Sequence, residues 1–109
     1  MPFVDRYATA APDRAEVDAM AGAVVVEFGT DWCGHCQAAR PHVQAAFESH
    51  PGVRHVKVED GRGRRLGRSF LVKLWPTLVF LRDGEEVARV VRPTDTDALS
   101  RAFNLVAPG

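Results

Sequence analysis

The sequence has no long hydrophobic run, no excess of charge of either sign and very few cysteines, and each absence narrows what the chain can be. Its longest apolar stretch falls far short of the roughly 20 residues that a membrane-spanning helix requires, so we expect no association with the membrane. Fourteen Lys and Arg residues balance fourteen Asp and Glu residues. Bulk electrostatics therefore favours neither nucleic acid nor an anionic membrane surface as a partner.

The N-terminal residues also lack the features of a signal peptide, because no basic segment is followed by an apolar run. We therefore expect a cytoplasmic protein. The sequence contains no internal repeat, low-complexity tract or linker, and a length of 109 residues suits one domain. Apolar residues make up 46% of the chain, which is enough for one small core. We predict a single domain over residues 1–109, with frayed ends at residues 1–2 and 107–109.

The two cysteines, Cys33 and Cys36, stand at a boundary between two predicted elements. An apolar segment, residues 23–28, precedes them, and a helical segment, residues 34–49, follows. A disulfide between cysteines this close closes too short a loop to stabilise the fold much. In a reducing compartment, such a pair is more often catalytic or metal-binding than structural. A Cys-x-x-Cys at a strand-to-helix junction is typical of a redox site.

The remaining sequence alternates between strand and helix patterns. Residues 23–28 are almost continuously apolar, which predicts a central strand buried on both faces, with Glu27 as the exception. Pro41 lies inside the helix after the cysteines and is expected to kink it. We predict strands over residues 3–8, 23–28, 53–58, 77–81 and 86–91, and helices over residues 12–20, 34–49, 64–70 and 94–106. This order predicts an α/β fold, with a mixed sheet flanked by helices on both faces.

Three motifs occur together in a characteristic order. Val26-Glu27-Phe28 is followed after three residues by Trp32-Cys33-Gly34-His35-Cys36, and Pro41 comes five residues after the second cysteine. Trp75-Pro76-Thr77 then precedes an apolar strand and the hairpin turn Asp83-Gly84. In these features the chain resembles the thioredoxin superfamily over about residues 8 to 106, and its Cys-Gly-His-Cys motif resembles that of protein disulfide isomerases. The resemblance implies the thioredoxin fold.

Some positions depart from the pattern of this superfamily. Gly29 stands where an aromatic residue is usual, and Arg92-Pro93 stands where a glycine commonly approaches the substrate. Trp75 is bulkier than the usual residue before the proline. We expect these differences to affect substrate recognition more than the chemistry.

Cys33 is the expected nucleophile. At a helix start, its sulfur faces free backbone N–H groups and the positive end of the helix dipole, which favour the reactive thiolate. Cys36, one turn further on, is expected to be less exposed, with a less depressed pKa, and to resolve the mixed disulfide. His35, when protonated, would stabilise the Cys33 thiolate and make the pair more oxidising. The alternative for His35 is a solvated residue without a role.

Glu27 is an acid in a buried strand, so we expect its pKa to be raised. The resemblance implies that Glu27 accepts the Cys36 proton through water. His55 and Lys57 are candidate polar neighbours, between which the pattern does not choose. The alternative is a strand-end acid that reaches solvent.

The resemblance also implies a cis peptide bond before Pro76. Pro76 is then expected to pack against the cysteines, while the backbone of Trp75 pairs with an extended substrate segment. Trp32 and Trp75 would form an apolar rim around Cys33, although each tryptophan would also fit plain core packing. Arg62, Arg64, Arg65 and Arg68 form a local basic run that is best explained as a solvated face.

The sequence therefore predicts a thiol–disulfide oxidoreductase that exchanges disulfides with protein substrates through Cys33 and Cys36. We expect no cofactor, because Gly61-Arg62-Gly63 lacks the residues of a nucleotide-binding loop. Recycling then requires an external electron donor, and the resemblance implies a thioredoxin reductase. One alternative is a non-catalytic thioredoxin-like binding or chaperone module that uses the tryptophan surface. A metal site formed by the two cysteines with His35 and His42 is less favoured, because His35 lies between the cysteines and points off the helix start.

Overall fold

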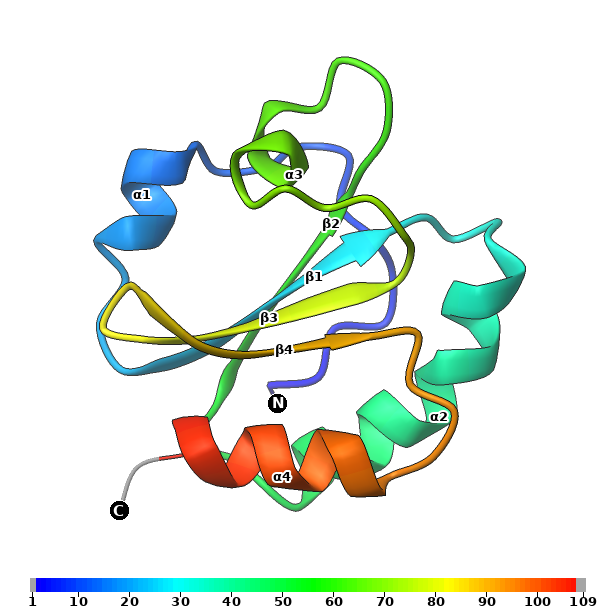
Figure 1. Ribbon diagram of the computed structural model, residues 1–109, viewed down its shortest axis with the longest axis vertical. Helices are drawn as coiled ribbons and strands as arrows, with labels where there is room; N and C mark the ends of the chain where they lie inside the picture. The colour runs from blue at the N-terminus through cyan, green and yellow to red at the C-terminus, as the bar shows by residue number, and fades with distance from the viewer. Residues whose placement is uncertain (1, 108–109) are drawn as a thin grey trace.

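A four-stranded mixed sheet forms the centre of the protein, for which the computed structural model describes residues 2–107 (Figure 1). The strand order is β2-β1-β3-β4. β1 runs parallel to β2 and antiparallel to β3, and β3 and β4 form an antiparallel hairpin. The strands are β1 (Ala23–Gly29), β2 (Arg54–Glu59), β3 (Thr77–Arg82) and β4 (Glu85–Val91). The predicted α/β fold with a mixed sheet is confirmed.

Two helices cover each face of the sheet (Figure 1). They are α1 (Arg14–Asp18), α2 (Gly34–Glu48), α3 (Arg65–Ser69) and α4 (Asp97–Val106). Successive side chains of a strand point to opposite faces. Val24 and Val26 of β1 therefore pack on the side of α1 and α3, whereas Val25 packs on the side of α2 and α4. This double coverage explains why every residue of β1, Glu27 included, is buried.

The predicted strand over residues 3–8 is wrong. Only Ala8 pairs with the sheet, through an isolated parallel bridge to Val58. The rest of this segment crosses the edge of β2 as irregular backbone, and side chains hold it there: the Val4 N–H donates to His55 Nδ1, and Lys57 Nζ donates to the Asp5 carbonyl. The ends predicted to fray fall partly at residues 1 and 108–109, which lie outside the described residues.

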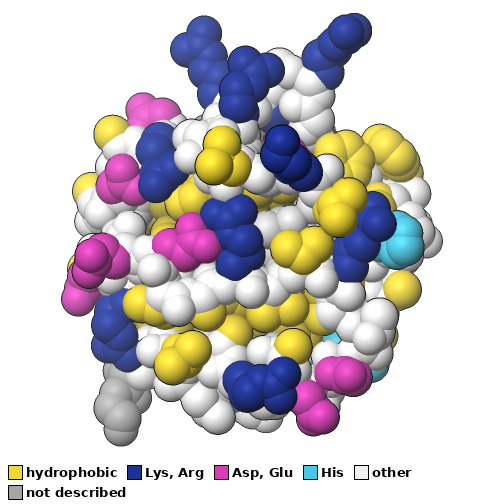
Figure 2. Space-filling model, viewed as in Figure 1, with side chains coloured by type: hydrophobic (Ala, Val, Ile, Leu, Met, Phe, Trp, Pro, Cys, Tyr) yellow, Lys and Arg dark blue, Asp and Glu magenta, His cyan; other side chains and the backbone are white. Residues whose placement is uncertain are grey.

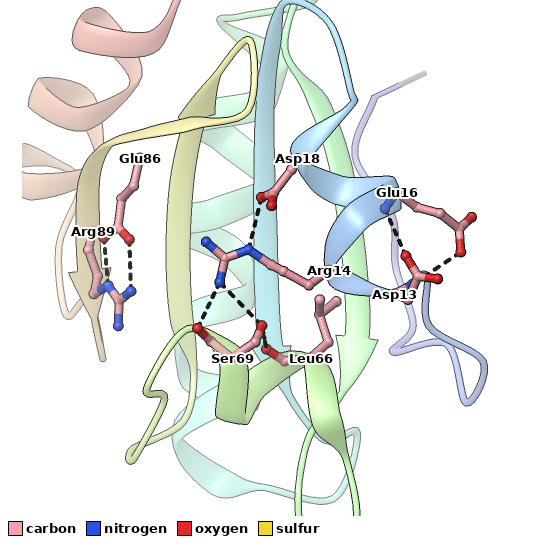
Figure 3. A network of polar contacts seen from close by, with 8 residues as sticks. All are labelled: Asp13, Arg14, Glu16, Asp18, Leu66, Ser69, Glu86 and Arg89. Atoms are coloured by element: carbon pink, nitrogen blue, oxygen red, sulfur yellow. Dashed lines mark hydrogen bonds and ion pairs between the residues drawn. The ribbon is translucent and has the colours of Figure 1, made fainter.

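Helix α1 begins two residues later than predicted, because Asp13 is its N-cap, and it also ends two residues earlier, at Asp18. The Asp13 carboxylate accepts from the Glu16 N–H at 2.8 Å, and the Glu16 side chain accepts from the Asp13 N–H at 3.2 Å, which is a capping box (Figure 3). Arg14 then links α1 to α3, because its guanidinium donates to the Ser69 carbonyl at 2.7 Å and pairs with Asp18 (Figure 3). Helix α4 likewise begins at residue 97, three residues later than expected.

Basic side chains gather over α3 at one end of the face shown in Figure 2. Arg62, Arg65 and Arg68 of the predicted basic run are exposed. Arg64 is half-buried, because it pairs with Glu59 at 2.7 Å. Arg64 thus anchors the loop before α3, while the other three arginines form a solvated face, as the sequence indicated.

Candidate redox site

The two cysteines lie where β1 passes through a short loop into α2 (Figure 1). Cys33 is the N-cap of α2, and its sulfur accepts from the Cys36 backbone N–H at 3.4 Å. Both cysteines are free thiols. The exposed fraction is 9% for Cys33 and 4% for Cys36. Cys36 is therefore the less accessible of the two, as the sequence predicted, and Cys33 lies at the N-terminus of α2, where the positive end of the helix dipole favours its thiolate.

The pKa of the Cys36 thiol is raised, so this cysteine loses its proton less readily than an ordinary one. Burial raises its pKa to about 11, and the neighbouring Cys33 raises it as well, although hydrogen bonds from the Thr30 backbone and from Tyr7 act in the opposite direction. Because a thiol must lose its proton before it attacks a disulfide, the groups that touch the Cys36 sulfur control that step.

Glu27 is fully enclosed and makes two strong hydrogen bonds. Its Oε1 accepts from His55 Nε2 at 2.8 Å, and its Oε2 accepts from the Tyr7 hydroxyl at 2.5 Å. The Val4 N–H donates to His55 Nδ1 at 2.9 Å, so Nε2 is the ring nitrogen that carries the proton. Lys57 is the residue opposite Glu27 on the neighbouring strand β2. Of the two polar neighbours that the sequence offered, His55 bonds the carboxylate directly, and Lys57 lies opposite Glu27 with its charge close enough to lower the pKa of the acid.

The expectation of a raised pKa for Glu27 is wrong. Burial by itself raises the pKa, but the hydrogen bond from His55, the positive charge of Lys57 and the hydrogen bond from Tyr7 outweigh it and hold the pKa below its ordinary value. Glu27 is accordingly a buried carboxylate that keeps its charge. Its oxygens contact Tyr7 and His55.

Tyr7 is the site residue that sequence reasoning missed. Its hydroxyl donates to Glu27, and its side chain packs in one cluster with the two cysteines, so Tyr7 links the acid to the second cysteine. Gly29 makes room for it, because a Cβ added at residue 29 would lie 2.5 Å from the Cys36 sulfur and 2.7 Å from the Tyr7 hydroxyl oxygen. The available signal was this glycine, at a position where the resemblance predicts an aromatic residue: a ring from elsewhere in the chain occupies the space beside the cysteines.

Two of the predicted substrate-binding residues, Trp32 and Trp75, lie beside the cysteines. The peptide bond between Trp75 and Pro76 is cis, as predicted. Trp32, with an exposed fraction of 75%, meets Trp75 edge to face at 5.9 Å between ring centroids. Trp75 packs against the two cysteines and Tyr7, and its indole N–H donates to Asp60 at 2.9 Å. The two indoles therefore form the apolar rim that the sequence indicated.

The backbone carbonyl of Trp75 already has a partner. Arg92 Nε donates to it at 2.8 Å, and the Arg92 N–H donates to the Pro76 carbonyl at 2.9 Å. An extended segment that pairs with the Trp75 carbonyl must therefore share it with the guanidinium or displace it.

His35 is exposed on the outer side of α2. It borders a shallow depression of about 350 Å³ that His42, Arg92 and Pro93 also line. Within residues 2–107, no group of three or more His, Cys, Asp or Glu side chains is arranged to hold a metal ion. Nor does any helix in that range have the length and apolar character needed to cross a membrane.

A reactive cysteine at a helix N-terminus, a buried partner one turn later and a cis-proline segment packed against both define a thiol–disulfide oxidoreductase of the thioredoxin fold. The thioredoxin family model matches residues 7–104, and the chain belongs to that family. A thioredoxin of Chlamydia trachomatis is 34% identical over 83 residues, which cover 76% of this chain and 81% of the relative.

Solved structures agree with this assignment. The reduced form of thioredoxin 2 from Pseudomonas aeruginosa is 63% identical, with a TM-score of 0.85 over 95% of this chain and 97% of that one. A mutant thioredoxin from Halobacterium salinarum is 28% identical, with a TM-score of 0.73 over 95% and 92% of the two chains. The protein is thus a disulfide oxidoreductase with a Cys-x-x-Cys dithiol, and the non-catalytic alternative receives no support.

Proposed function

We propose that this thioredoxin works as a reductase of protein disulfides, with Cys33 as the attacking and Cys36 as the resolving residue. The observation that carries the proposal is the asymmetry of the pair: Cys33 is the N-cap of α2 and is 9% exposed, whereas Cys36 is 4% exposed and has a raised pKa. The Cys33 thiolate attacks a substrate disulfide and forms a mixed disulfide. Cys36 then attacks the Cys33 sulfur, and the substrate leaves with both of its sulfurs reduced.

The substrate is an extended protein segment that lies against Trp32, Trp75 and Pro76. Trp32 offers a largely exposed apolar face, and Trp75 is held in place by its bond to Asp60. Backbone pairing at Trp75 would make recognition largely independent of substrate sequence. Binding then requires Arg92 either to share the Trp75 carbonyl with the substrate or to release it.

Glu27 supports the resolving cysteine. The direct transfer of the Cys36 proton to Glu27 through water, which the resemblance implied, is disfavoured by the lowered pKa of the acid and by the interposed Tyr7. We assign Glu27 a positioning role that acts through the Tyr7 hydroxyl.

The reductase direction belongs to a reducing compartment, and we propose the cytoplasm, with a thioredoxin reductase as electron donor. The test is insulin reduction by catalytic amounts of the protein, supplied with NADPH and either a bacterial thioredoxin reductase or glutathione with its reductase. We expect sustained turnover with thioredoxin reductase and slower turnover with glutathione. Turnover with glutathione alone would contradict the proposed donor, and stoichiometric oxidation of added reduced proteins would contradict the direction.

We also propose that His35 tunes the redox potential. It directly follows the first residue of α2 and is exposed, so its cationic form lies near the Cys33 thiolate and stabilises the reduced dithiol. His35→Pro is expected to lower the potential of the pair by about 30 mV or more, which corresponds to a tenfold change in the equilibrium constant against glutathione. His42→Pro is unsuitable as a control because it would break α2, so His42→Ala serves. An unchanged or higher potential in His35→Pro would refute the electrostatic role.

A further inference from the structure

We propose that the Tyr7 hydroxyl is the hydrogen-bond donor that stabilises the Cys36 sulfur when this cysteine attacks, and that Glu27 competes for the same proton. This inference rests on the resolving role proposed for Cys36. It makes Tyr7 a catalytic residue, because its hydroxyl contacts a reacting atom, and it makes Glu27 a positioning residue.

The geometry gives one hydroxyl two partners. Tyr7 is 5% exposed and packs against both cysteines. Its O–H donates to Glu27 Oε2 at 2.5 Å. Its oxygen lies beside the Cys36 sulfur, because a Cβ added at residue 29 would be 2.7 Å from the oxygen and 2.5 Å from the sulfur, and this placement lets Tyr7 lower the pKa of Cys36. A phenol has a single proton to donate, so it serves one partner at a time. While Cys36 is a thiol, the Tyr7 proton points to Glu27. Once Cys36 is a thiolate, its negatively charged sulfur becomes the acceptor of this proton's hydrogen bond.

The phenol ring is held in place from several sides. The Tyr7 N–H donates to Asp31 at 3.1 Å, and the next residue, Ala8, bridges to β2. Lys57 Nζ lies 4.5 Å from the centre of the ring. Gly29 leaves the space beside the hydroxyl free of a Cβ. Such a fixed donor needs little reorganisation as charge develops on the sulfur, which is how preorganised dipoles accelerate a reaction.

The hydroxyl also remains a donor throughout. Burial, together with the adjacent Glu27 carboxylate, raises the pKa of Tyr7 far above its ordinary range, so the phenol keeps its proton. The charged and titratable groups around Tyr7 and Cys36 come from several neighbouring elements. They are Glu27 on β1, His55 and Lys57 on β2, Asp31 in the loop before α2, Cys33 and Arg40 on α2, and Asp5 in the N-terminal segment.

The proton of Cys36 goes to solvent. A surface depression of about 210 Å³, lined in part by Tyr7, Cys36 and Lys57, opens beside the sulfur. In the resolving step, the Cys36 thiol releases its proton to water at this depression and the thiolate accepts from Tyr7. The thiolate attacks the Cys33 sulfur, the bond between Cys33 and the substrate sulfur breaks, and the Cys33–Cys36 disulfide forms. The substrate leaves as a thiolate and takes up a proton from water.

Stopped-flow reaction of the reduced protein with a nitrobenzoate disulfide, whose released thiol absorbs visible light, separates the two cysteines. The first release reports the attack by Cys33, and the second reports resolution by Cys36. In Tyr7→Phe we expect an unchanged first release and a second release that is about tenfold slower at neutral pH, since a hydrogen bond to a charged group is lost. The half-maximal pH of the second release should rise by about one unit, and the two proteins should converge at high pH.

Tyr7 is the chain's one tyrosine, so growth on 3-fluorotyrosine alters this residue alone while keeping its shape. The more acidic phenol is a stronger donor, and the half-maximal pH of the second release should fall. Ser69→Ala removes a hydroxyl of α3 that bonds the Leu66 carbonyl, and it should change neither release.

Equal second releases in wild type, Tyr7→Phe and the fluorinated protein would overturn the inference and leave water as the only partner of the sulfur. An equal slowing of both releases in Tyr7→Phe would also overturn it, because that pattern would mean that the substitution disturbs the structure around both cysteines. Absence of any second release in the wild type would instead refute the proposed role of Cys36 and would be recognised as such.

Discussion

Cys33→Ser is expected to leave insulin disulfides intact, at the uncatalysed rate, whereas Cys36→Ser is expected to become trapped on its substrate. Cys33 is the N-cap of α2 and the more exposed of the two cysteines, so we expect it alone to begin the reaction. A serine hydroxyl does not replace a thiolate as a nucleophile at neutral pH. In Cys36→Ser the first step still proceeds, but nothing attacks the Cys33 sulfur afterwards.

The two variants control for one another, because each removes one sulfur from the same site. Mass spectrometry of the acid-quenched reaction should show a covalent adduct of Cys36→Ser with a disulfide-containing peptide and none with Cys33→Ser. Insulin turbidity from Cys33→Ser equal to that from the wild type would refute the assigned nucleophile. An adduct on Cys33→Ser would mean that the roles of the two cysteines are exchanged.

Glu27→Leu is expected to lower the free energy of unfolding of the reduced protein by about 3 kcal/mol at neutral pH, as is typical when one partner of a buried charged network is removed. The substitution leaves the His55 Nε2–H and the buried Lys57 without their carboxylate. Urea unfolding measures the difference. Glu86→Gln is the matched control, because it breaks an exposed ion pair with Arg89 on β4 (Figure 3) and should cost under about 1 kcal/mol.

The same variant, Glu27→Leu, tests whether folding lowers or raises the pKa of Glu27. The folded protein holds this pKa below the ordinary value of 4.5, so the unfolded chain takes up the proton first as the pH falls. The stabilisation by Glu27 is therefore fully present above the unfolded-state pKa and is lost as the pH drops through the folded-state pKa. The stability gap between wild type and Glu27→Leu should close under acid conditions. A Glu27→Leu protein more stable than wild type at neutral pH would mean that burial dominates and that the pKa is raised.

Much of the fold followed from local patterns. The apolar run of β1, the Asp83-Gly84 hairpin turn and the cysteine spacing each depend on residues close together in the sequence, and the structure confirms all three. The error at residues 3–8 has a physical cause. Only Ala8 reaches the edge of β2, and contacts with the side chains of His55 and Lys57, instead of backbone pairing, hold the rest of the segment.

The resemblance extended this prediction to the cis bond before Pro76, which the structure contains. The rim residue Trp75 also packs at the cysteines, as predicted. It did not predict the Arg92 guanidinium on the Trp75 carbonyl. That contact joins the loop after β4 to the loop before β3, and it depends on how the hairpin closes rather than on either segment alone.

By itself, the sequence determined where the chemistry is: two cysteines at the N-terminus of α2, preceded by a buried strand that carries one acid. Spacing and local propensity suffice for that, because the helix itself positions both sulfurs. Only the tertiary structure decided what surrounds Cys36. Tyr7, Glu27 and His55 come from three different segments and meet around one buried carboxylate. Their contacts reverse the direction expected for the pKa shift of Glu27 and place a phenol beside Cys36, because charge and hydrogen-bond energies depend on distances in space rather than along the chain.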